Sequence, residues 1–283
     1  MRRSENTRPL RIVHLSDTHL FGDPAALHYN RVDTREALSR TLGAADSMTD
    51  LDLVVASGDL SDDGTVEIYH EVARQIGGFV TAHGATAVYA MGNHDVRAGF
   101  ESVLGIRETI LMRRGFRVIT LDSTVPESGY GRLTNEQLNW LESELALPAP
   151  NGTILVLHHP PIPASSTLLQ ALELHDPSRL LEICSTSDVR VILAGHYHHA
   201  LVSAGRGVPV VVSPGVANHS DPLAAVGTER AVIGSGFGVV EVGVDGEVRT
   251  LFVEVPHPSD GEEIFSLTPD EVARIAATAG SPS

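Results

Sequence analysis

Polar side chains follow apolar, strand-like segments at five separate places in this chain. The segments are rich in β-branched and aliphatic residues, and they are Ile12–Leu15, Leu51–Ala56, Ala87–Met91, Ile154–Leu157 and Val189–Leu193. The polar residues that follow them are, in order, Asp17 and His19, Asp59, Asn93 and His94, His158, and His196 and His198. Ligand sites of open α/β sheets lie at the carboxyl ends of the strands, so we expect these distant groups to converge. Oxygen and imidazole donors of this kind suit a hydrolytic site with two metal ions.

The charge of the chain argues against a large polyanionic partner. The 283 residues include 36 acidic and 20 basic ones, which gives a formal net charge of -16 at pH 7. The basic residues form no block, so the chain lacks the electrostatic pattern of a general nucleic-acid binder. We therefore expect no bulk nucleic acid as a partner, while a small anion at a locally positive site remains open.

The sequence predicts a soluble, cytoplasmic protein that does not contact a membrane. No run approaches the roughly 18 apolar residues that a membrane helix requires. The apolar stretch Leu10–Leu15, which follows Arg2 and Arg3, is too short for the core of a signal peptide. The single cysteine, Cys184, lies among leucine and isoleucine residues and is expected to be a buried, inert thiol.

Strand and helix patterns alternate through the first third of the chain, which favours an α/β fold with parallel strands and crossover helices. The pattern is looser in the next part and resumes at Thr153–Leu157. The predicted strands are Leu10–Ser16, Leu51–Ser57, Ala85–Met91, Val118–Leu121, Thr153–Leu157 and Val189–Leu193. The predicted helices are Val32–Met48, Thr65–His83, Thr134–Leu147 and Ser178–Ser185. One domain over residues 10–256 is the simplest division of the chain.

From Ala200 onward the pattern changes to antiparallel strands, predicted at Val208–Val212, Ala231–Val244 and Val248–Val255. Asp245 and Gly246 predict a hairpin turn between the last two of these strands. Residues 257–283 are expected to form a C-terminal extension, with an acidic segment at Ser259–Glu263 and a short helix at Pro269–Ala277.

The spacing within each polar group suggests which side chains act together. Asp17 and His19 are two residues apart, so in an extended segment both would point the same way. The carboxylate of Asp59 could bridge two cations, and the Asn93 amide oxygen is a neutral ligand. His94 has Asp95 beside it as a candidate orienting partner.

Two further histidine groups follow the later strands. His158 and His159 are adjacent and face opposite ways, so only one of them should reach the ions. His196 and His198 repeat the spacing of two, and His199 should face away. The remaining histidines are interpreted as ordinary surface or helix residues, and they are His14, His28, His70, His83, His175, His219 and His257. Each group alone could be a turn or a solvated pair, but five together favour a site.

The ordered set of motifs resembles the calcineurin-like metallophosphoesterase superfamily, over a stretch from about Leu10 to Val255. The segment His158-His159-Pro160-Pro161, with the preceding helix that contains Trp140, resembles the class III cyclic nucleotide phosphodiesterases and their glycerophosphodiesterase relatives. The resemblance implies a four-layer α/β/β/α sandwich of two mixed sheets, with the site at one edge of the paired sheets.

The resemblance also implies a ligand set for two divalent or trivalent transition metal ions. The first ion would be held by Asp17, His19, Asp59 and His198. The second would be held by Asp59, Asn93, His158 and His196. Mn, Fe, Zn and Co suit these donors about equally, so the sequence does not choose among them.

The activity implied is hydrolysis of small phosphodiesters, with 3',5'-cyclic nucleotides as the foremost substrates. A hydroxide between the two ions would attack phosphorus, and His94, supported by Asn93, would protonate the leaving group. A phosphomonoesterase or nucleotide pyrophosphatase is an alternative, and a noncatalytic scaffold of the same fold is another. Substrate choice is expected to depend on Pro160–Pro177 and Pro214–Gly236, and the relatives suggest a homodimer by analogy. Three leucines of the first loop could form a lid or a dimer contact, and they are Leu168, Leu169 and Leu172.

Overall fold

Burial along the first two strands explains why the chain builds two stacked sheets. The computed structural model describes residues 8–280. In β1 (Leu10–Leu15) and β2 (Leu53–Ser57) nearly every residue is buried, and alternate residues belong to different cores. Ile12 and Val55 pack in a core shared with a second sheet, whereas Val13 packs on the opposite face. Strands that are buried on both faces need a covering layer on each side.

The first sheet has five strands in the order β15-β14-β1-β2-β3. The strands β1, β2 and β3 (Thr86–Ala90) are parallel, as predicted. The hairpin of β14 (Gly236–Val242) and β15 (Val248–Glu254) turns at the predicted Asp245 and Gly246. β14 pairs antiparallel with β1, although the paired residues of these two strands are more than 220 positions apart in the chain.

The second sheet has six strands in the order β10-β11-β9-β7-β5-β4. Its strands are β4 (Ile110–Arg113), β5 (Phe116–Thr120), β7 (Gly152–Val156), β9 (Val189–Ala194), β10 (Leu201–Gly205) and β11 (Val208–Val212). The four central strands are parallel, and the edge strands β4 and β10 are antiparallel to their neighbours. The two edge strands were not predicted from the sequence.

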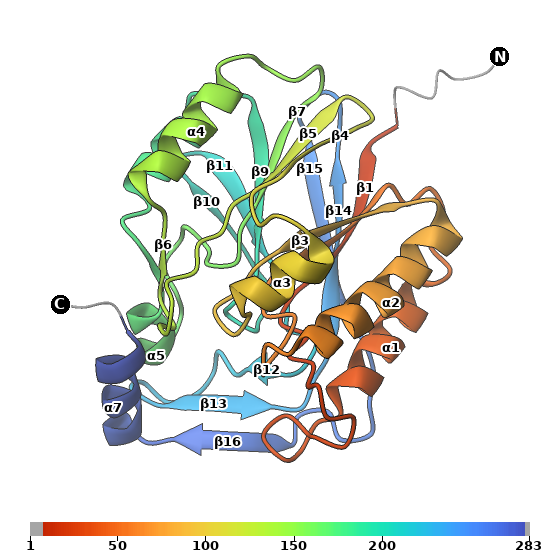
Figure 1. Ribbon diagram of the computed structural model, residues 1–283. Coiled ribbons are helices and arrows are strands. Elements are labelled where there is room, and N and C mark those ends of the chain that lie inside the picture. The colour runs from red at the N-terminus through yellow and green to blue at the C-terminus, as the bar shows by residue number, and fades with distance from the viewer. Residues whose placement is uncertain (1–7, 281–283) are drawn as a thin grey trace.

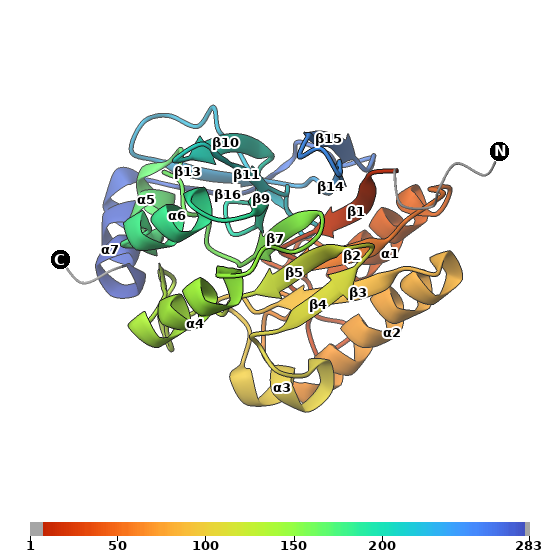
Figure 2. The same cartoon turned by 90° about the horizontal axis from the view of Figure 1, so that it is seen from above.

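Helices cover the outer face of each sheet (Figure 2). Helices α1 (Thr34–Ala45) and α2 (Val66–His83) pack on the first sheet, and α3 (Arg97–Leu104) packs on α2. Helices α4 (Asn135–Leu145) and α6 (Ser178–Ser185) pack on the second sheet, where Cys184 is buried as expected. The predicted four-layer α/β/β/α sandwich of two mixed sheets is therefore confirmed (Figure 1).

Several small elements lie beside the carboxyl ends of the central strands. A third sheet contains β12 (His219–Ser220), β13 (Glu229–Val232) and β16 (Glu263–Leu267), and a fourth contains β6 (Gly131–Arg132) and β8 (Leu174–His175). Helix α5 (Thr167–Ala171) packs against α7 (Pro269–Ala279), which confirms the predicted C-terminal helix.

The single strand predicted over Ala231–Val244 is wrong. The chain leaves the third sheet after Val232 and enters the first sheet at Gly236. Between them, Ile233 N–H donates to the carbonyl of Glu262 at 2.8 Å. Gly234 and Ser235 lie at the break, between apolar residues that both sheets bury, and they are the local signal that the prediction overlooked.

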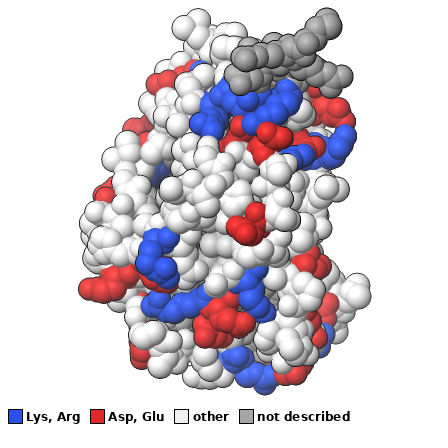
Figure 3. Space-filling view, turned by 90° about the vertical axis from the view of Figure 1, so that its right-hand side faces the viewer, with Lys and Arg blue, Asp and Glu red and all other residues white. Residues whose placement is uncertain are grey.

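The surface of the described chain shows two plain features. No helix in residues 8–280 is long and apolar enough to cross a membrane. On the face shown in Figure 3, arginine and acidic side chains are interspersed. Ion pairs of the described chain include Arg74 with Glu71 at 2.6 Å and Arg11 with Glu241 at 2.8 Å.

Candidate metal centre

The segments that follow β1 and β2 lie side by side and bring the first two polar groups together. The backbone N–H of Asp17 donates to the carbonyl of Gly58 at 3.0 Å, and that of His19 donates to the carbonyl of Asp59 at 2.9 Å. The Asp17 carboxylate in turn accepts the backbone N–H of His196 at 3.1 Å. Three of the five groups are therefore joined through the backbone.

Five of the predicted ligands have left-handed backbone conformations, with φ of 55° at Asp17, 43° at His19, 49° at Asp59, 71° at His196 and 52° at His198. The prediction that Asp17 and His19 lie on an extended segment is therefore wrong. The side chains still converge because the chain turns sharply where each strand ends. Positive φ at residues other than glycine costs about 1–3 kcal/mol each, and such strain is typical of functional sites.

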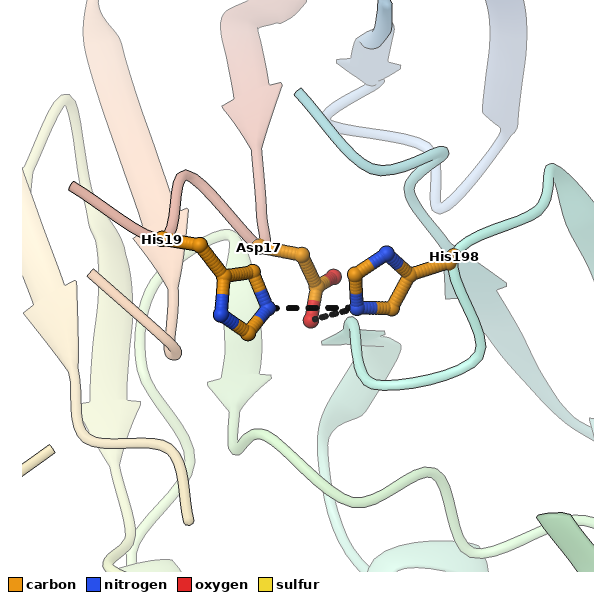
Figure 4. A group of neighbouring side chains, drawn as sticks. All are labelled: Asp17, His19 and His198. Carbon is orange, nitrogen blue, oxygen red and sulfur yellow. Dashed lines mark hydrogen bonds and ion pairs between the residues drawn. The ribbon is translucent and has the colours of Figure 1, made fainter. Parts of the chain in front are cut away.

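The first cluster contains Asp17, His19 and His198 (Figure 4). The Nε2 atom of His198 lies 3.4 Å from Asp17 Oδ1 and 3.2 Å from Nε2 of His19. Two imidazole nitrogens and a carboxylate oxygen thus face a common point. This is a donor set that a transition metal ion would hold together.

The second cluster contains Asp59, His158 and His196. The Nε2 atom of His158 lies 3.3 Å from Asp59 Oδ2, and that same carboxylate oxygen lies 3.6 Å from Nε2 of His19. Asp59 therefore lies between the two clusters. Burial would raise the pKa of Asp59, but the charges of His158 and His94 hold it well below its usual range.

The residues present fit a pair of metal ions. Asn93 Oδ1 and His158 Nε2 are buried atoms without a hydrogen-bond partner. Buried polar atoms are rarely left unpaired, and an unpaired one requires an explanation such as an ion.

Each of the four candidate histidine ligands is also anchored through its other ring nitrogen. The acceptors are Asp62 Oδ1 for His19, and the carbonyl oxygens of Ser57 for His158, Leu172 for His196 and Asn218 for His198. Histidines that bind metals almost always donate their second ring N–H in this manner.

Glycine is required where the loops cross. A Cβ atom at Gly92 would lie 2.2 Å from the backbone nitrogen and from Oδ1 of Asp59. Gly58 has a φ of 104°, and a Cβ atom there would lie 2.5 Å from Nδ1 of His158. The glycines of both motifs therefore allow the candidate ligands to approach one another.

His94 lies at the rim of the site, and its side chain is 43% exposed. Its backbone N–H donates to Asp59 Oδ1 at 2.8 Å, and its Nδ1 lies 3.3 Å from Asp62 Oδ1. Burial lowers the pKa of His94, but the carboxylates of Asp59 and Asp62 outweigh it and raise the pKa to about 9. The two carboxylates therefore favour the protonated form of the imidazole.

The predicted pairing of His94 with Asp95 is wrong. The Asp95 carboxylate is buried and accepts the backbone N–H groups of Leu60, Ser61 and Gly92 at 2.9–3.2 Å. It joins the loops after β2 and β3 instead. Asp62 is the orienting carboxylate, and the sequence reasoning missed it. Its spacing of three residues from Asp59 is the signal that could have identified it.

Two histidines that were interpreted as ordinary surface or helix residues are buried. His14 lies inside β1 with its Nε2 atom 2.9 Å from the Ser57 hydroxyl, and His28 packs against His19 at a ring-centroid distance of 4.8 Å. His159 points away from the clusters toward Ser123 and the carbonyl of Gly129, as expected for one of two adjacent histidines.

A cleft opens over both clusters, with a free volume of about 590 Å³ that includes its part open to solvent. Its base contains His19, Asp59, Asn93, His196 and His198, and His94 lies at its rim. Its sides contain residues of both loops that were expected to choose the substrate, among them Leu168, Leu172 and Glu229. No arginine or lysine is among the described residues that line this cleft.

Curated proteins similar to this chain are described as phosphodiesterases. A probable cyclic nucleotide phosphodiesterase of Rhodococcus erythropolis is 39% identical, over 99% of this chain and 95% of its own length. A cAMP/cGMP dual specificity phosphodiesterase of Mycobacterium tuberculosis is 35% identical, over 99% and 90%. A 3',5'-cyclic adenosine monophosphate phosphodiesterase of Escherichia coli is 29% identical, over 85% and 88%.

Solved structures share the fold at low sequence identity. The purple acid phosphatase of yellow lupin seeds matches 98% of this chain and 57% of its own, with a TM-score of 0.62 and 14% identity. GAP50, the anchor in the inner membrane complex of Plasmodium, matches 97% and 96%, with a TM-score of 0.54 and 12% identity. The family model of calcineurin-like phosphoesterases matches residues 10–200. With the strand-end clusters and the full-length relatives, this match shows that the chain belongs to the calcineurin-like phosphoesterase family and is a hydrolase.

Proposed function

We propose that this protein is a dinuclear-metal phosphodiesterase that hydrolyses small phosphodiesters, with 3',5'-cyclic nucleotides as its substrates. The observation that carries the proposal is the pair of clusters with Asp59 between them. Each histidine of these clusters has a hydrogen bond from its other ring nitrogen to an acceptor outside the clusters. The similarity over 99% of the chain to relatives described as cyclic nucleotide phosphodiesterases supports the substrate class.

In this proposal Asp17, His19, Asp59 and His198 hold the first ion. Asp59, Asn93, His158 and His196 hold the second. Two such ions would supply Lewis acidity at phosphorus and at the attacking water. Mn, Fe, Zn and Co all suit this donor set.

His94 is proposed as the general acid. Its position at the rim leaves the ring accessible to a substrate, and the carboxylates of Asp59 and Asp62 raise its pKa and so favour the protonated ring. A departing ribose alkoxide needs a proton as its bond to phosphorus breaks, and a positioned acid contributes about 10²–10⁴ in rate. Asn93 lies next to it, and its side-chain oxygen is buried and has no hydrogen-bond partner.

The charge of the cleft favours a diester over the monoester and pyrophosphate alternatives. A phosphomonoester carries about 1.5–2 negative charges at pH 7, whereas a diester carries one. The described lining offers no arginine or lysine for an additional charge, and it contains the carboxylate of Glu229. A scaffold without catalysis would not need the complete, externally anchored donor set.

The proposal includes a cytoplasmic location, supported by the lack of a membrane-spanning helix in residues 8–280. It also includes a homodimer, because exposed apolar side chains such as Leu223 and Val226 would be covered by a second copy. The proposal keeps the division into a domain at 10–256 and an extension at 257–283, and β16 and α7 of this extension pack against β13 and α5.

Elemental analysis combined with activity measurements tests the proposal. The purified protein should contain close to two transition metal ions per chain and hydrolyse cyclic AMP, cyclic GMP and bis(p-nitrophenyl) phosphate. Chelation should abolish all three activities, and added metal should restore them. Full activity of a metal-free preparation would refute the metal centre. Turnover of p-nitrophenyl phosphate or ADP, with none of the diesters, would support the monoesterase or pyrophosphatase alternative.

A further inference from the structure

Part of the cleft lining outside both clusters is apolar. Leu168, Leu169 and Leu172 from α5 and its C-terminus belong to this lining. Tyr29 and Phe265 belong to it as well, with ring centroids 4.9 Å apart in an edge-to-face arrangement. Aliphatic and aromatic surfaces of this kind bind planar heterocycles through stacking and burial.

A buried carboxylate lines the same cleft. Glu229, on β13, is only 3% exposed, and its carboxylate accepts the hydroxyl of Ser166, the residue that caps α5. The hydroxyl of Ser220 also donates to it. Burial raises the pKa of Glu229.

Glu229 has no cationic partner among the described side chains. The adjacent Arg230 points to the other face of β13, where it pairs with Asp221 at 2.6 Å and with Glu263 at 3.1 Å. A buried carboxylate without a cation is unfavourable for folding, because two hydroxyl donors compensate only part of its lost hydration. Such a group inside a cleft is a candidate for ligand binding.

The substrate class proposed above supplies the missing donors. A carboxylate only accepts hydrogen bonds, so it selects bases by their N–H groups. The pairing edge of guanine offers two adjacent donors, N1–H and the 2-amino group. The corresponding edge of adenine offers only the 6-amino group. A guanine therefore fits this acceptor better than an adenine does.

We infer that Glu229 is a specificity-determining residue that accepts hydrogen bonds from the purine base of the substrate, while the base lies between the α5 leucines and the rings of Tyr29 and Phe265. The inference rests on the proposed function, since it assumes that the phosphate of the same molecule lies over the metal clusters. It assigns base recognition to a side chain that lies outside both clusters.

Kinetics of Glu229→Gln test the inference with substrates that differ in donor number. The value of kcat/KM should fall about 30- to 100-fold for cyclic GMP and about 10-fold for cyclic AMP, mainly through KM, since one bond to a charged acceptor is worth about tenfold or more. Purine riboside 3',5'-cyclic phosphate has no donor at this edge, and bis(p-nitrophenyl) phosphate has no base. Both should change less than twofold. Equal losses on all four substrates would overturn the inference.

Two variants separate recognition from support of the loop. The control is Glu173→Gln, which changes a carboxylate of the loop that contains α5. Glu173 accepts the Ala164 N–H and does not line the cleft, so this variant should prefer the same purine base as the wild type does. Ser166→Ala removes the bond between Glu229 and α5. If Ser166→Ala reproduces the Glu229→Gln losses in full, the carboxylate merely holds α5, and the inference is wrong.

Inhibition by products tests the inference even if cyclic nucleotides are not turned over. GMP and ribose 5-phosphate should compete with bis(p-nitrophenyl) phosphate, and Glu229→Gln should raise the inhibition constant of GMP at least tenfold while leaving that of ribose 5-phosphate unchanged. A wild type that hydrolyses only the nitrophenyl diester would refute the proposed substrate class. An unchanged inhibition constant for GMP would refute the role of Glu229 alone.

Discussion

The bottom and the side of the cleft differ in how strongly their chemistry restricts the residue types that can form them. We call the residues of the two clusters, together with Asn93, the floor, and the α5 leucines with Tyr29, Glu229 and Phe265 the wall. The floor comes from the ends of buried central strands, and its histidines are fixed by outside acceptors. The wall comes from short elements, and Tyr29 is more than half exposed.

This difference shows which part of a site is chemically constrained. Ions accept few kinds of ligand, so the floor can contain only carboxylate, amide and imidazole groups at set spacings. An apolar wall can be built from many side chains with similar effect. We therefore expect changes in the floor to affect every substrate and changes in the wall to affect the binding of particular substrates.

The largest effect is expected for Asp59→Ala. Because this carboxylate lies between both clusters, its loss should release both ions and reduce all diesterase activity at least 1,000-fold. The thermal midpoint should fall together with the metal content, since bound metal stabilises the folded chain. Asp46→Ala, at an exposed carboxylate, is the control. Retention of both ions in the Asp59 variant would show that the floor does not depend on a shared ligand.

A smaller and more selective effect is expected for His94→Ala. The rate constant kcat on cyclic nucleotides should fall about 10²- to 10⁴-fold, because a ribose alkoxide must be protonated as it leaves. The loss on bis(p-nitrophenyl) phosphate should be much smaller, since nitrophenolate departs without a proton. Metal content should stay nearly intact. Equal losses on both substrates would instead assign His94 to transition-state charge or to positioning.

Asp62→Asn should reduce activity by about 10- to 100-fold, which is typical of residues that orient metal ligands. The variant loses the charge that faces both His19 and His94. In the double variant with His94→Ala, the part of the loss that Asp62 transmits through His94 should disappear. Fully additive losses would indicate that Asp62 acts only on the floor, through His19.

The smallest effect is expected in the wall, for Phe265→Ala. The KM for cyclic nucleotides should rise about 3- to 10-fold through lost ring contacts, with kcat within twofold of the wild type. Activity on bis(p-nitrophenyl) phosphate should be nearly unchanged. Ile106→Ala, at an exposed apolar residue outside the cleft, is the control. A large fall in kcat on every diester would contradict the separation of floor and wall.

The sequence predicted the central parallel strands and the five strand ends because buried parallel strands have long apolar runs and ions limit the residues that follow them. The four layers were predicted from the resemblance to the metallophosphoesterases. The sequence did not predict β4 and β10, which are short, partly exposed edge strands. His14 was misjudged because the hydroxyl of a neighbouring strand, from Ser57, lets a histidine lie inside a sheet. Such a partner is not visible in one sequence.

The wall could not be assembled from the sequence, since its members meet only through tertiary structure. Glu229 and Phe265 lie on β13 and β16, which pair antiparallel although 30 residues separate these two strands. The two loops with the leucines and Glu229 were named as the source of substrate choice, and that choice stays a prediction. The assignment of individual metal ligands also stays a prediction that the variants above test.

The pairing of β14 with β1 has a consequence for synthesis of the chain. A ribosome adds roughly 5–20 residues per second, so an early segment waits many seconds for a late one. Asp17 emerges long before His196 and His198, and β1 gains its second neighbour only after Val242 has been made. Until then one edge of β1 is unpaired, and the first cluster lacks its last histidine. The complete donor set therefore exists only after most of the chain has left the ribosome, and full metal loading is a late step in the maturation of this enzyme.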